Sequence, residues 1–291
     1  MFIFFTELEE ADGNFMKLLY VTDLHGSGWK YDRLFDLACA YRPDAVINGG
    51  DMLPNNGNRF TQKDFITGKL NSHFAQFDAI GVTYLCYLGN DDLRIWDRLF
   101  RDTCEQHHCV HDLAQSKVQV HGVDFIGMNW VVDYPFRLKD RCRMDNSGFT
   151  FEPQMGTGLL STHEGWHEVE NWHEYARTLP TIADELAALV RPETMSWSAY
   201  VFHMPPDRLG LDVCFDGRQV GSAAIYDFLA ENQPRLSFHG HIHESPEISG
   251  AWKADLDATT CVQPGQSDAR NLVYATVDTD TMVAERHTEP W

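Results

Sequence analysis

Short runs of hydrophobic residues recur along the chain, and segments with helical spacing separate several of them. The first run predicts a strand over residues 17–22. A helix is expected next, around residues 30–40, where Leu34, Leu37 and Ala38 fall on one face. Further strands are predicted at residues 44–49, 82–89, 117–130 (two strands turning at Gly122), 197–202, 235–240, 272–277 and 282–287, and further helices near Phe74 and over residues 181–190 and 222–231.

The regular pattern is lost between about residues 131 and 180, a stretch rich in Asp, Arg, Gly, His and Trp. Because no linker divides the chain, we interpret this stretch as an insertion or cap within one domain spanning residues 16–291. Residues 1–15 precede the first strand and are expected to form an N-terminal tail. Strand–helix alternation followed by hairpins predicts an α/β fold with mixed sheets.

Side chains that can bind metals follow five of the predicted strands. They are Asp23 and His25 after the first strand, Asp51 after the second, Asn90 with Asp91 and Asp92 after the third, His203 after residues 197–202, and His241 and His243 after residues 235–240. In open α/β sheets, ligands bind beyond the carboxyl ends of the strands. Imidazole suits zinc and iron, while carboxylate and amide oxygens suit manganese and magnesium. The pattern therefore predicts a site for two divalent cations.

The net charge of the chain limits the classes of partner that we expect it to bind. A formal net charge of −20 argues against nucleic acid and anionic membranes, because both would repel it. A phosphate ligand remains compatible, since bound cations reverse the field inside one pocket. The chain has no run of about 18 apolar residues, so no membrane span is expected. Its seven cysteines have scattered spacing, which indicates a reducing compartment and predicts a cytoplasmic location.

The five motifs DxH, GD, GN, H and GHxH, in this order, resemble those of the calcineurin-like metallophosphoesterases. The resemblance covers most of residues 16–277, and residues 220–245 look like a poorly characterised bacterial and archaeal branch of phosphoesterases. It implies a four-layer α/β/β/α sandwich of two mixed sheets. It also implies one metal held by Asp23, His25, Asp51 and His243, and a second held by Asp51, Asn90, His203 and His241. Manganese is the expected metal, with iron, zinc and magnesium as alternatives.

The activity implied by this resemblance is that of a dinuclear phosphohydrolase, with phosphodiesters favoured over phosphomonoesters. A hydroxide bridging the two metals would attack phosphorus. Asp51 and Asn90, together with Asp91 and Asp92, are the expected catalytic residues. The expected substrate is a small phosphorylated molecule, for example a nucleotide-like one.

The sequence departs from the family's usual GNH motif. Asp91 stands where the family has a histidine that stabilises the transition state and protonates the leaving group, and Asp92 matches the acid that orients this histidine. A carboxylic acid with a pKa near 4 is a poor proton donor at neutral pH. We therefore expect good leaving groups or an acid from elsewhere, such as a histidine of the insertion. A metal-binding module without turnover is the alternative.

Two further motifs lie in the insertion. Arg137 and Arg141 belong to a basic patch that could clamp a phosphate or form a solvated face balanced by nearby acids. His163 and His167 match the HExxH motif of zinc-protease helices, although Gly165 and the lack of an apolar helix face argue against that interpretation. We expect the two histidines to line the phosphoesterase pocket instead.

Overall fold

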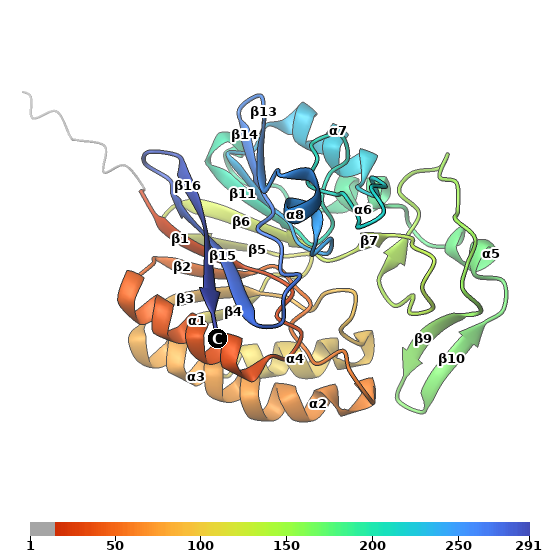
Figure 1. Cartoon of the computed structure of the whole chain (residues 1–291), viewed down its shortest axis with the longest axis horizontal. Coiled ribbons are helices and arrows are strands. Elements are labelled where there is room, and N and C mark those ends of the chain that lie inside the picture. Colours follow the sequence, from red (N-terminus) through yellow and green to blue (C-terminus); the bar gives the residue numbers. More distant parts are fainter. Residues whose placement is uncertain (1–14) are drawn as a thin grey trace, which may run out of the picture.

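The computed structural model describes residues 15–291, so the predicted tail lies, except for Phe15, outside the described part of the chain. Two six-stranded mixed sheets pack face to face, and helices cover their outer faces (Figure 1). This arrangement is a four-layer α/β/β/α sandwich, and it confirms the predicted fold class.

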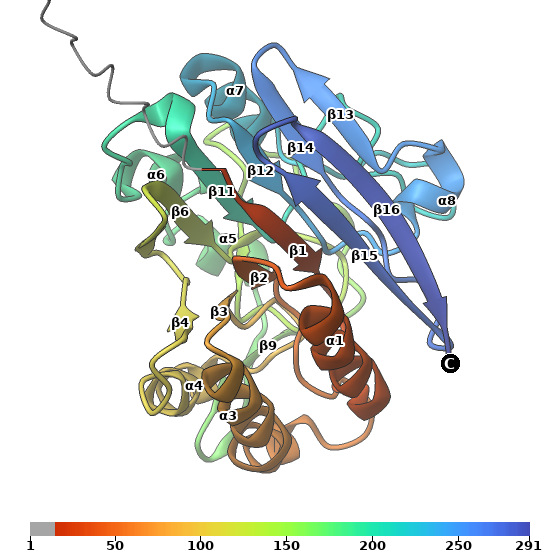
Figure 2. The ribbon, with the colours of Figure 1, turned by 90° about the vertical axis from the view of Figure 1, so that its left-hand side faces the viewer.

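The first sheet has the strand order β16-β15-β1-β2-β3-β4. Strands β1 to β4 are parallel to one another, and β15 and β16 add an antiparallel edge beside β1 (Figure 2). Parallel strands place their carboxyl ends at one edge of the sheet, so the loops that follow them gather there. The strands are β1 (Lys17–Val21), β2 (Ala45–Asn48), β3 (Thr83–Cys86), β4 (Val110–Asp112), β15 (Asn271–Asp278) and β16 (Val283–Pro290).

The second sheet has the order β13-β14-β12-β11-β6-β5. Its four central strands are parallel, and each edge strand is antiparallel to its neighbour. The strands β5 (Lys117–Val120) and β6 (Val123–Met128) turn at His121 and Gly122, both of which have positive φ. The remaining strands are β11 (Ser198–Phe202), β12 (Leu236–Phe238), β13 (Lys253–Leu256) and β14 (Thr259–Val262).

Side-chain alternation along β1 shows how the layers are joined. Leu18 and Tyr20 point between the two sheets, whereas Leu19 and Val21 pack against the helices on the outer face. A strand buried on both faces in this way is continuously apolar, which explains the uninterrupted hydrophobic run. The helices over the first sheet are α1 (Gly28–Tyr41), α2 (Gln62–Phe65), α3 (Asn71–Ile80) and α4 (Asp97–Cys104), and those over the second are α6 (Ile182–Ala188) and α7 (Ala223–Asn232).

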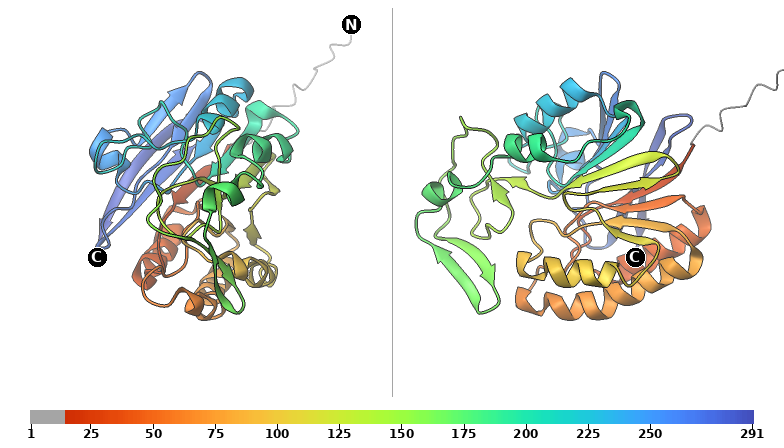
Figure 3. Two further views of the ribbon diagram at one scale, coloured as in Figure 1. Left: turned by 90° about the vertical axis from the view of Figure 1, so that its right-hand side faces the viewer. Right: turned by 180° about the vertical axis from the view of Figure 1, so that it is seen from behind.

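The segment between β6 and α6 extends from one end of the sandwich (Figure 3). It contains the short parallel pair β7 (Val131–Val132) and β8 (Cys142–Arg143), the hairpin of β9 (Gly158–Thr162) and β10 (Gly165–Val169), and helix α5 (Trp172–Ala176). A last short helix, α8 (Ser245–Ser249), follows the final histidine motif. None of the helices within residues 15–291 combines the length and apolar character that a membrane crossing requires.

Candidate metal centre

The seven predicted metal ligands come together at the carboxyl ends of β1, β2, β3, β11 and β12. The two sheets meet there, and each of these strands is parallel to at least one neighbour within its own sheet. The ligands arrive on separate loops because each strand delivers its side chains just past its last residue. These ligands are Asp23, His25, Asp51, Asn90, His203, His241 and His243.

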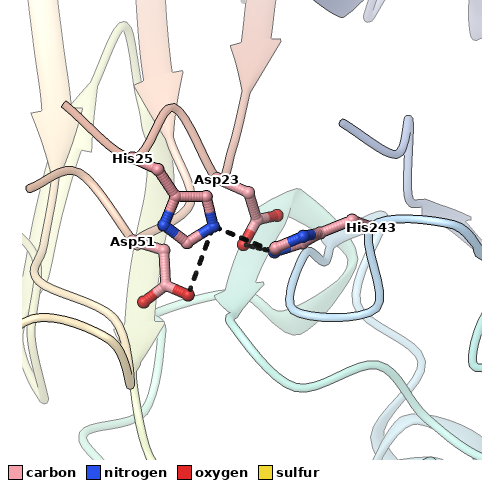
Figure 4. A group of neighbouring side chains, drawn as sticks. All are labelled: Asp23, His25, Asp51 and His243. Carbon is pink, nitrogen blue, oxygen red and sulfur yellow. Dashed lines mark hydrogen bonds and ion pairs between the residues drawn. The ribbon is translucent and has the colours of Figure 1, made fainter. Parts of the chain in front are cut away.

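The first group contains Asp23, His25, Asp51 and His243, whose ligand atoms all lie within 4.8 Å of one another (Figure 4). The Nε2 atom of His243 is 3.2 Å from Asp23 Oδ1 and 3.1 Å from His25 Nε2. His25 Nε2 is in turn 4.0 Å from Asp51 Oδ2. Two carboxylates and two imidazoles that converge in this way can hold one divalent transition metal.

The second group is centred on the amide oxygen of Asn90. This Oδ1 atom lies 2.9 Å from His203 Nε2 and 2.6 Å from His241 Nδ1. His203 Nε2 is also 3.5 Å from Asp51 Oδ2, so the Asp51 carboxylate lies between the two groups. The geometry brings together both predicted ligand sets, with Asp51 common to them.

The hydrogen bonding of His203 shows that these residues fit a cation. Its Nδ1 atom is 2.7 Å from the carbonyl oxygen of Gly49, and only an N–H at Nδ1 can donate to that oxygen. When the ring is neutral, its Nε2 directs a lone pair toward the oxygens of Asn90 and Asp51, which are also acceptors. Buried acceptors that face one another need a proton or a cation between them. A backbone partner on the second nitrogen is also how metal-binding histidines are oriented.

The electrostatics of the site are those of closely coupled buried charges. Burial disfavours charge on His203 and His243, yet Asp51 and Asp23 respectively raise the pKa of each ring to about 9. Burial and the neighbouring His203 lower the pKa of His241 to about 4. Burial opposes ionisation of Asp51, but the charge and hydrogen bond of His203 hold its pKa well below the usual range. A positive charge at the centre is therefore strongly favoured.

The backbone at the site adopts unusual conformations. Asp23, His25, Asp51 and His241 have φ values of 58°, 44°, 50° and 67°. Residues other than glycine seldom adopt this left-handed region, although Asp and His are enriched among the exceptions. Such conformations persist where the surrounding structure enforces them, and they are concentrated at functional sites. The strand-end turns thus aim these ligands inward at a cost in backbone strain.

Asp92 is buried and accepts hydrogen bonds from backbone amides close to the ligands. Its Oδ1 accepts a hydrogen bond from the amide of Leu53, and its Oδ2 accepts from the amides of Met52 and Gly89. Burial and the nearby Asp51 raise the pKa of Asp92, while these amides oppose the shift. The carboxylate ties the loop after Asp51 to the loop before Asn90. Its observed contacts are those of a positioning residue, whereas the sequence suggested a catalytic one.

Asp91 faces the site and is bound by an arginine that no sequence motif had singled out. Its Oδ1 accepts a hydrogen bond from Arg59 Nη1 at 2.9 Å, and its Oδ2 accepts from Asn55 Nδ2 at 2.9 Å. Asn55 Nδ2 is also 3.0 Å from His25 Nδ1, so Asp91 is linked to a predicted ligand. Asn55 lies in the irregular loop after Asp51, and Arg59 begins the short 3-10 helix η1 (Arg59–Thr61) that follows it. No periodic pattern in the sequence marks either residue.

Arg141, which the sequence offered as a phosphate clamp, does not line the cavity beside the centre. Its side chain is buried, donates through Nε to the carbonyl oxygen of Gly89 at 2.8 Å, and forms an ion pair with Asp97. The second predicted arginine, Arg137, does line the cavity beside the centre, where it is hydrogen-bonded to Thr157. The basic patch therefore divides into one structural residue and one cavity residue.

His163 and His167 do not line that cavity, and the protease interpretation of their motif is wrong. His163 lies in the turn of the β9–β10 hairpin. His167 lies in β10, where it is paired with Leu160 of β9. The HExxH motif needs a helix that places both histidines on one face, whereas β10 is an exposed strand. Trp166, which directly precedes His167, does line the cavity.

A cavity of about 940 Å³ opens beside the centre. Asp51, Asn90 and His241 form part of its wall. The insertion and the loop before α7 contribute exposed aromatic side chains to the rest. These are Phe136, Trp166 and Phe215, and Tyr134 lies deeper, with its ring 5.9 Å from that of His241. The site can thus accept a ligand much larger than inorganic phosphate.

The two-sheet sandwich with Asp and His ligands at its strand ends is that of a metal-dependent phosphoesterase. Residues 16–245 match the profile of the family described as calcineurin-like phosphoesterase, and the chain belongs to this family. The resemblance inferred from the five motifs is therefore confirmed. A search of functionally curated proteins finds no match to this sequence.

Solved structures share the fold at low sequence identity. The crystal structure of TT1561 from Thermus thermophilus is 17% identical, with a TM-score of 0.58, and the match covers 94% of this chain and 98% of that chain. A dimetal phosphatase from Danio rerio is 12% identical, with a TM-score of 0.50, and the match covers 94% and 98% of the two chains. The fold thus extends over nearly the whole chain.

Proposed function

We propose that this protein hydrolyses small phosphodiesters with the help of two divalent cations, of which manganese is the first candidate. The observation that carries the proposal is the convergence of seven ligand side chains in two groups that share Asp51, at the wall of a large cavity. The structurally similar protein from Danio rerio is a dimetal phosphatase, which supports metal-assisted phosphoester hydrolysis here as well.

Two divalent ions, when bound, supply Lewis-acid chemistry at a phosphoryl group. Asp23, His25, Asp51 and His243 would hold one ion, and Asp51, Asn90, His203 and His241 would hold the other. Gly49 fixes the orientation of the His203 ring, and Asp92 fixes the spacing of the Asp51 and Asn90 loops. These residues preorganise the centre before substrate arrives.

The shape of the cavity supports a diester with an organic group on at least one side. Its volume of about 940 Å³ extends from the centre to Phe136 and Phe215, both more than half exposed. Aromatic side chains in such a wall can stack on a planar group of a ligand. A nucleotide-like or aryl ester would use this surface, whereas a small phosphomonoester would leave it empty.

The nature of the leaving group follows from Asp91. This residue is ion-paired with Arg59, so it is not arranged to donate a proton. His163 and His167 do not line the cavity, so neither is placed to act as a replacement acid. We therefore expect the highest turnover with esters whose leaving group departs without protonation, such as nitrophenolate. The missing acid is also the observation that favours the second candidate, a metal-binding module of the same fold without turnover.

The test uses the full chain loaded with Mn²⁺ and offered bis(p-nitrophenyl) phosphate or p-nitrophenyl phosphate. We expect turnover of the diester to exceed that of the monoester, and Asp51→Asn to abolish both. Asp32→Asn, a change to an exposed carboxylate paired with Lys69, is the control and should leave activity intact. Two bound metal ions without turnover of either ester would instead establish the non-catalytic module. Equal or greater monoester turnover would contradict the diester preference.

A further inference from the structure

Arg59 is a cation placed directly beside the metal centre. Its Nη1 donates to the carboxylate oxygen Oδ1 and to the carbonyl oxygen of Asp91, both at 2.9 Å. The amide of Asp91 donates to Asp51 Oδ1 at 2.8 Å, so Arg59 is separated from the shared ligand by one residue. Arg59 and Asp91 both line the cavity, with about a quarter of each side chain exposed.

The guanidinium of Arg59 retains unused donors. Within residues 15–291, no residue accepts a hydrogen bond from its Nε or Nη2. The other two cavity arginines are more fully engaged and are not bonded to the loops of the centre. Arg218 forms a bidentate pair with Glu152 and a further pair with Asp216, and Arg137 contacts Thr157 and Glu168.

We propose that Arg59 is a substrate-contacting residue that binds the non-bridging oxygens of the phosphoryl group, and that Asp91 is the positioning residue that holds it there. This inference rests on the proposed function. It assigns a role to the aspartate found in place of the expected histidine: Asp91 does not transfer a proton but fixes a permanent positive charge at the mouth of the centre. Arginine suits this task because its planar donors match two phosphate oxygens and its charge does not titrate at neutral pH.

The charges around the cavity support the assignment. Asp91 lies within hydrogen-bonding reach of the centre and, without Arg59, would present a negative charge to an anionic substrate. Nearby residues keep Arg59 in place. Gln62 donates to the carbonyl oxygen of Asp91 at 3.1 Å and accepts from the amide of Leu93, and Phe60 packs on Trp166 with ring centroids 5.0 Å apart. The loop bearing Arg59 is thus fastened to both the Asn90 loop and the insertion.

The experiment measures binding of inorganic phosphate to the Mn²⁺-loaded full chain by calorimetry, together with metal content and kcat and KM for bis(p-nitrophenyl) phosphate. We expect Arg59→Met to weaken phosphate binding about tenfold or more with metal content unchanged, because a charge-assisted hydrogen bond is lost. Arg59→Lys should retain part of the affinity. Arg101→Met, which removes an arginine paired with Asp112 outside the cavity, is the matched control and should bind phosphate normally.

A second variant separates a direct contact from a merely structural role. If Arg59 binds phosphate, Arg59→Met leaves Asp91 unpaired beside the anion, so adding Asp91→Asn should restore part of the lost affinity. If the Arg59–Asp91 pair only supports the local backbone, Asp91→Asn alone and Arg59→Met alone should weaken phosphate binding equally. The double variant should then recover none of the lost phosphate affinity. That outcome, or unchanged phosphate affinity in Arg59→Met, would overturn the inference. Absence of metal or of turnover in the unaltered protein would overturn the proposed function instead.

Discussion

The Nε2 atoms of His25 and His243 lie 3.1 Å apart, although the two residues are separated by 218 positions in the chain. A hydrogen bond between them requires a proton on one of the two nitrogens. In addition, His25 Nε2 faces the carboxylate of Asp51, and His243 Nε2 faces the carboxylate of Asp23. A cation satisfies all four groups at once. Because the two histidines follow strands of different sheets, the same cation would also join the two halves of the sandwich.

Removal of metal should therefore lower the stability of the fold. A ligand that binds only the native state adds about 2.7 kcal/mol at a hundredfold excess over its Kd. We expect Mn²⁺ to raise the midpoint of thermal unfolding of the chelator-treated protein, and His243→Ala to lose much of this gain. His163→Ala, which alters an exposed histidine outside the cavity, should keep it in full. An equal gain in His243→Ala would show that His243 does not bind the cation.

Gly240 is the position where an added methyl group should damage the centre most directly. A Cβ atom there would lie 2.1 Å from Thr22 Oγ1 and 2.6 Å from Asp23 Oδ2, which is closer than atoms can approach. We expect Gly240→Ala to displace Asp23 and to lower both the bound metal and the free energy of unfolding, the latter by about 1–3 kcal/mol. Gly68→Ala, where a Cβ would meet nothing within 4 Å, is the control. Unchanged metal content in Gly240→Ala would contradict this account.

The buried strands and the ligand motifs were the features that the sequence could predict. Residues 17–22 and 197–202 are mainly apolar runs that are directly followed by polar ligand residues, and they correspond closely to β1 and β11. This agreement has a physical cause: strands buried on both faces tolerate few polar residues, and the chemistry must therefore follow where they end. The short strands β4 and β13 were missed because they are partly exposed and lack such a run. Strand β14 is largely buried, but its two threonines interrupt the apolar pattern.

The surroundings of the site could not be predicted, because they depend on contacts between distant loops. Arg141 and Arg137 lie four residues apart in one basic patch, yet one is buried against Gly89 and the other lines the cavity. The HExxH motif matched a helix signature by residue identity alone, while the turn at His163 and the positive φ of Gly165 produced a hairpin. Arg59 had no motif at all, since its role depends on the position of Asp91.

The aromatic wall of the cavity should contribute to substrate affinity. Phe136 is 61% exposed and lines the cavity, so a stacked aryl group would bury part of its ring. We expect Phe136→Ala to raise KM for bis(p-nitrophenyl) phosphate about fivefold, equivalent to about 1 kcal/mol of apolar burial, with kcat and metal content preserved. Ile80→Ala changes an exposed apolar residue outside the cavity and should leave KM unaltered. No change in KM for Phe136→Ala would exclude stacking on this residue.

His73 is a buried histidine of helix α3 and is not one of the candidate ligands. Its ring lies among Tyr31, Phe77 and Tyr84, with centroid separations of 5.0, 4.9 and 5.4 Å. Within residues 15–291, neither ring nitrogen has a hydrogen-bond partner. Burial, with a smaller contribution from the charge of Lys69, lowers the pKa of His73 to about 3. The ring is therefore neutral in the folded protein at every pH in common use.

This shift predicts a specific loss of stability in mild acid. Between pH 3 and 6.5 the unfolded chain binds a proton at His73 that the folded chain does not, so the free energy of unfolding falls as the pH is lowered through 6.5. From pH 7.5 to 5.5 the contribution of His73 to this fall should be about 1.4 kcal/mol. Urea unfolding of the chelator-treated protein at the two pH values measures it. His73→Phe keeps the aromatic packing and removes the titration, so its stability should decline less over the same interval by about that amount; a parallel decline in both proteins would show that His73 is protonated in the fold.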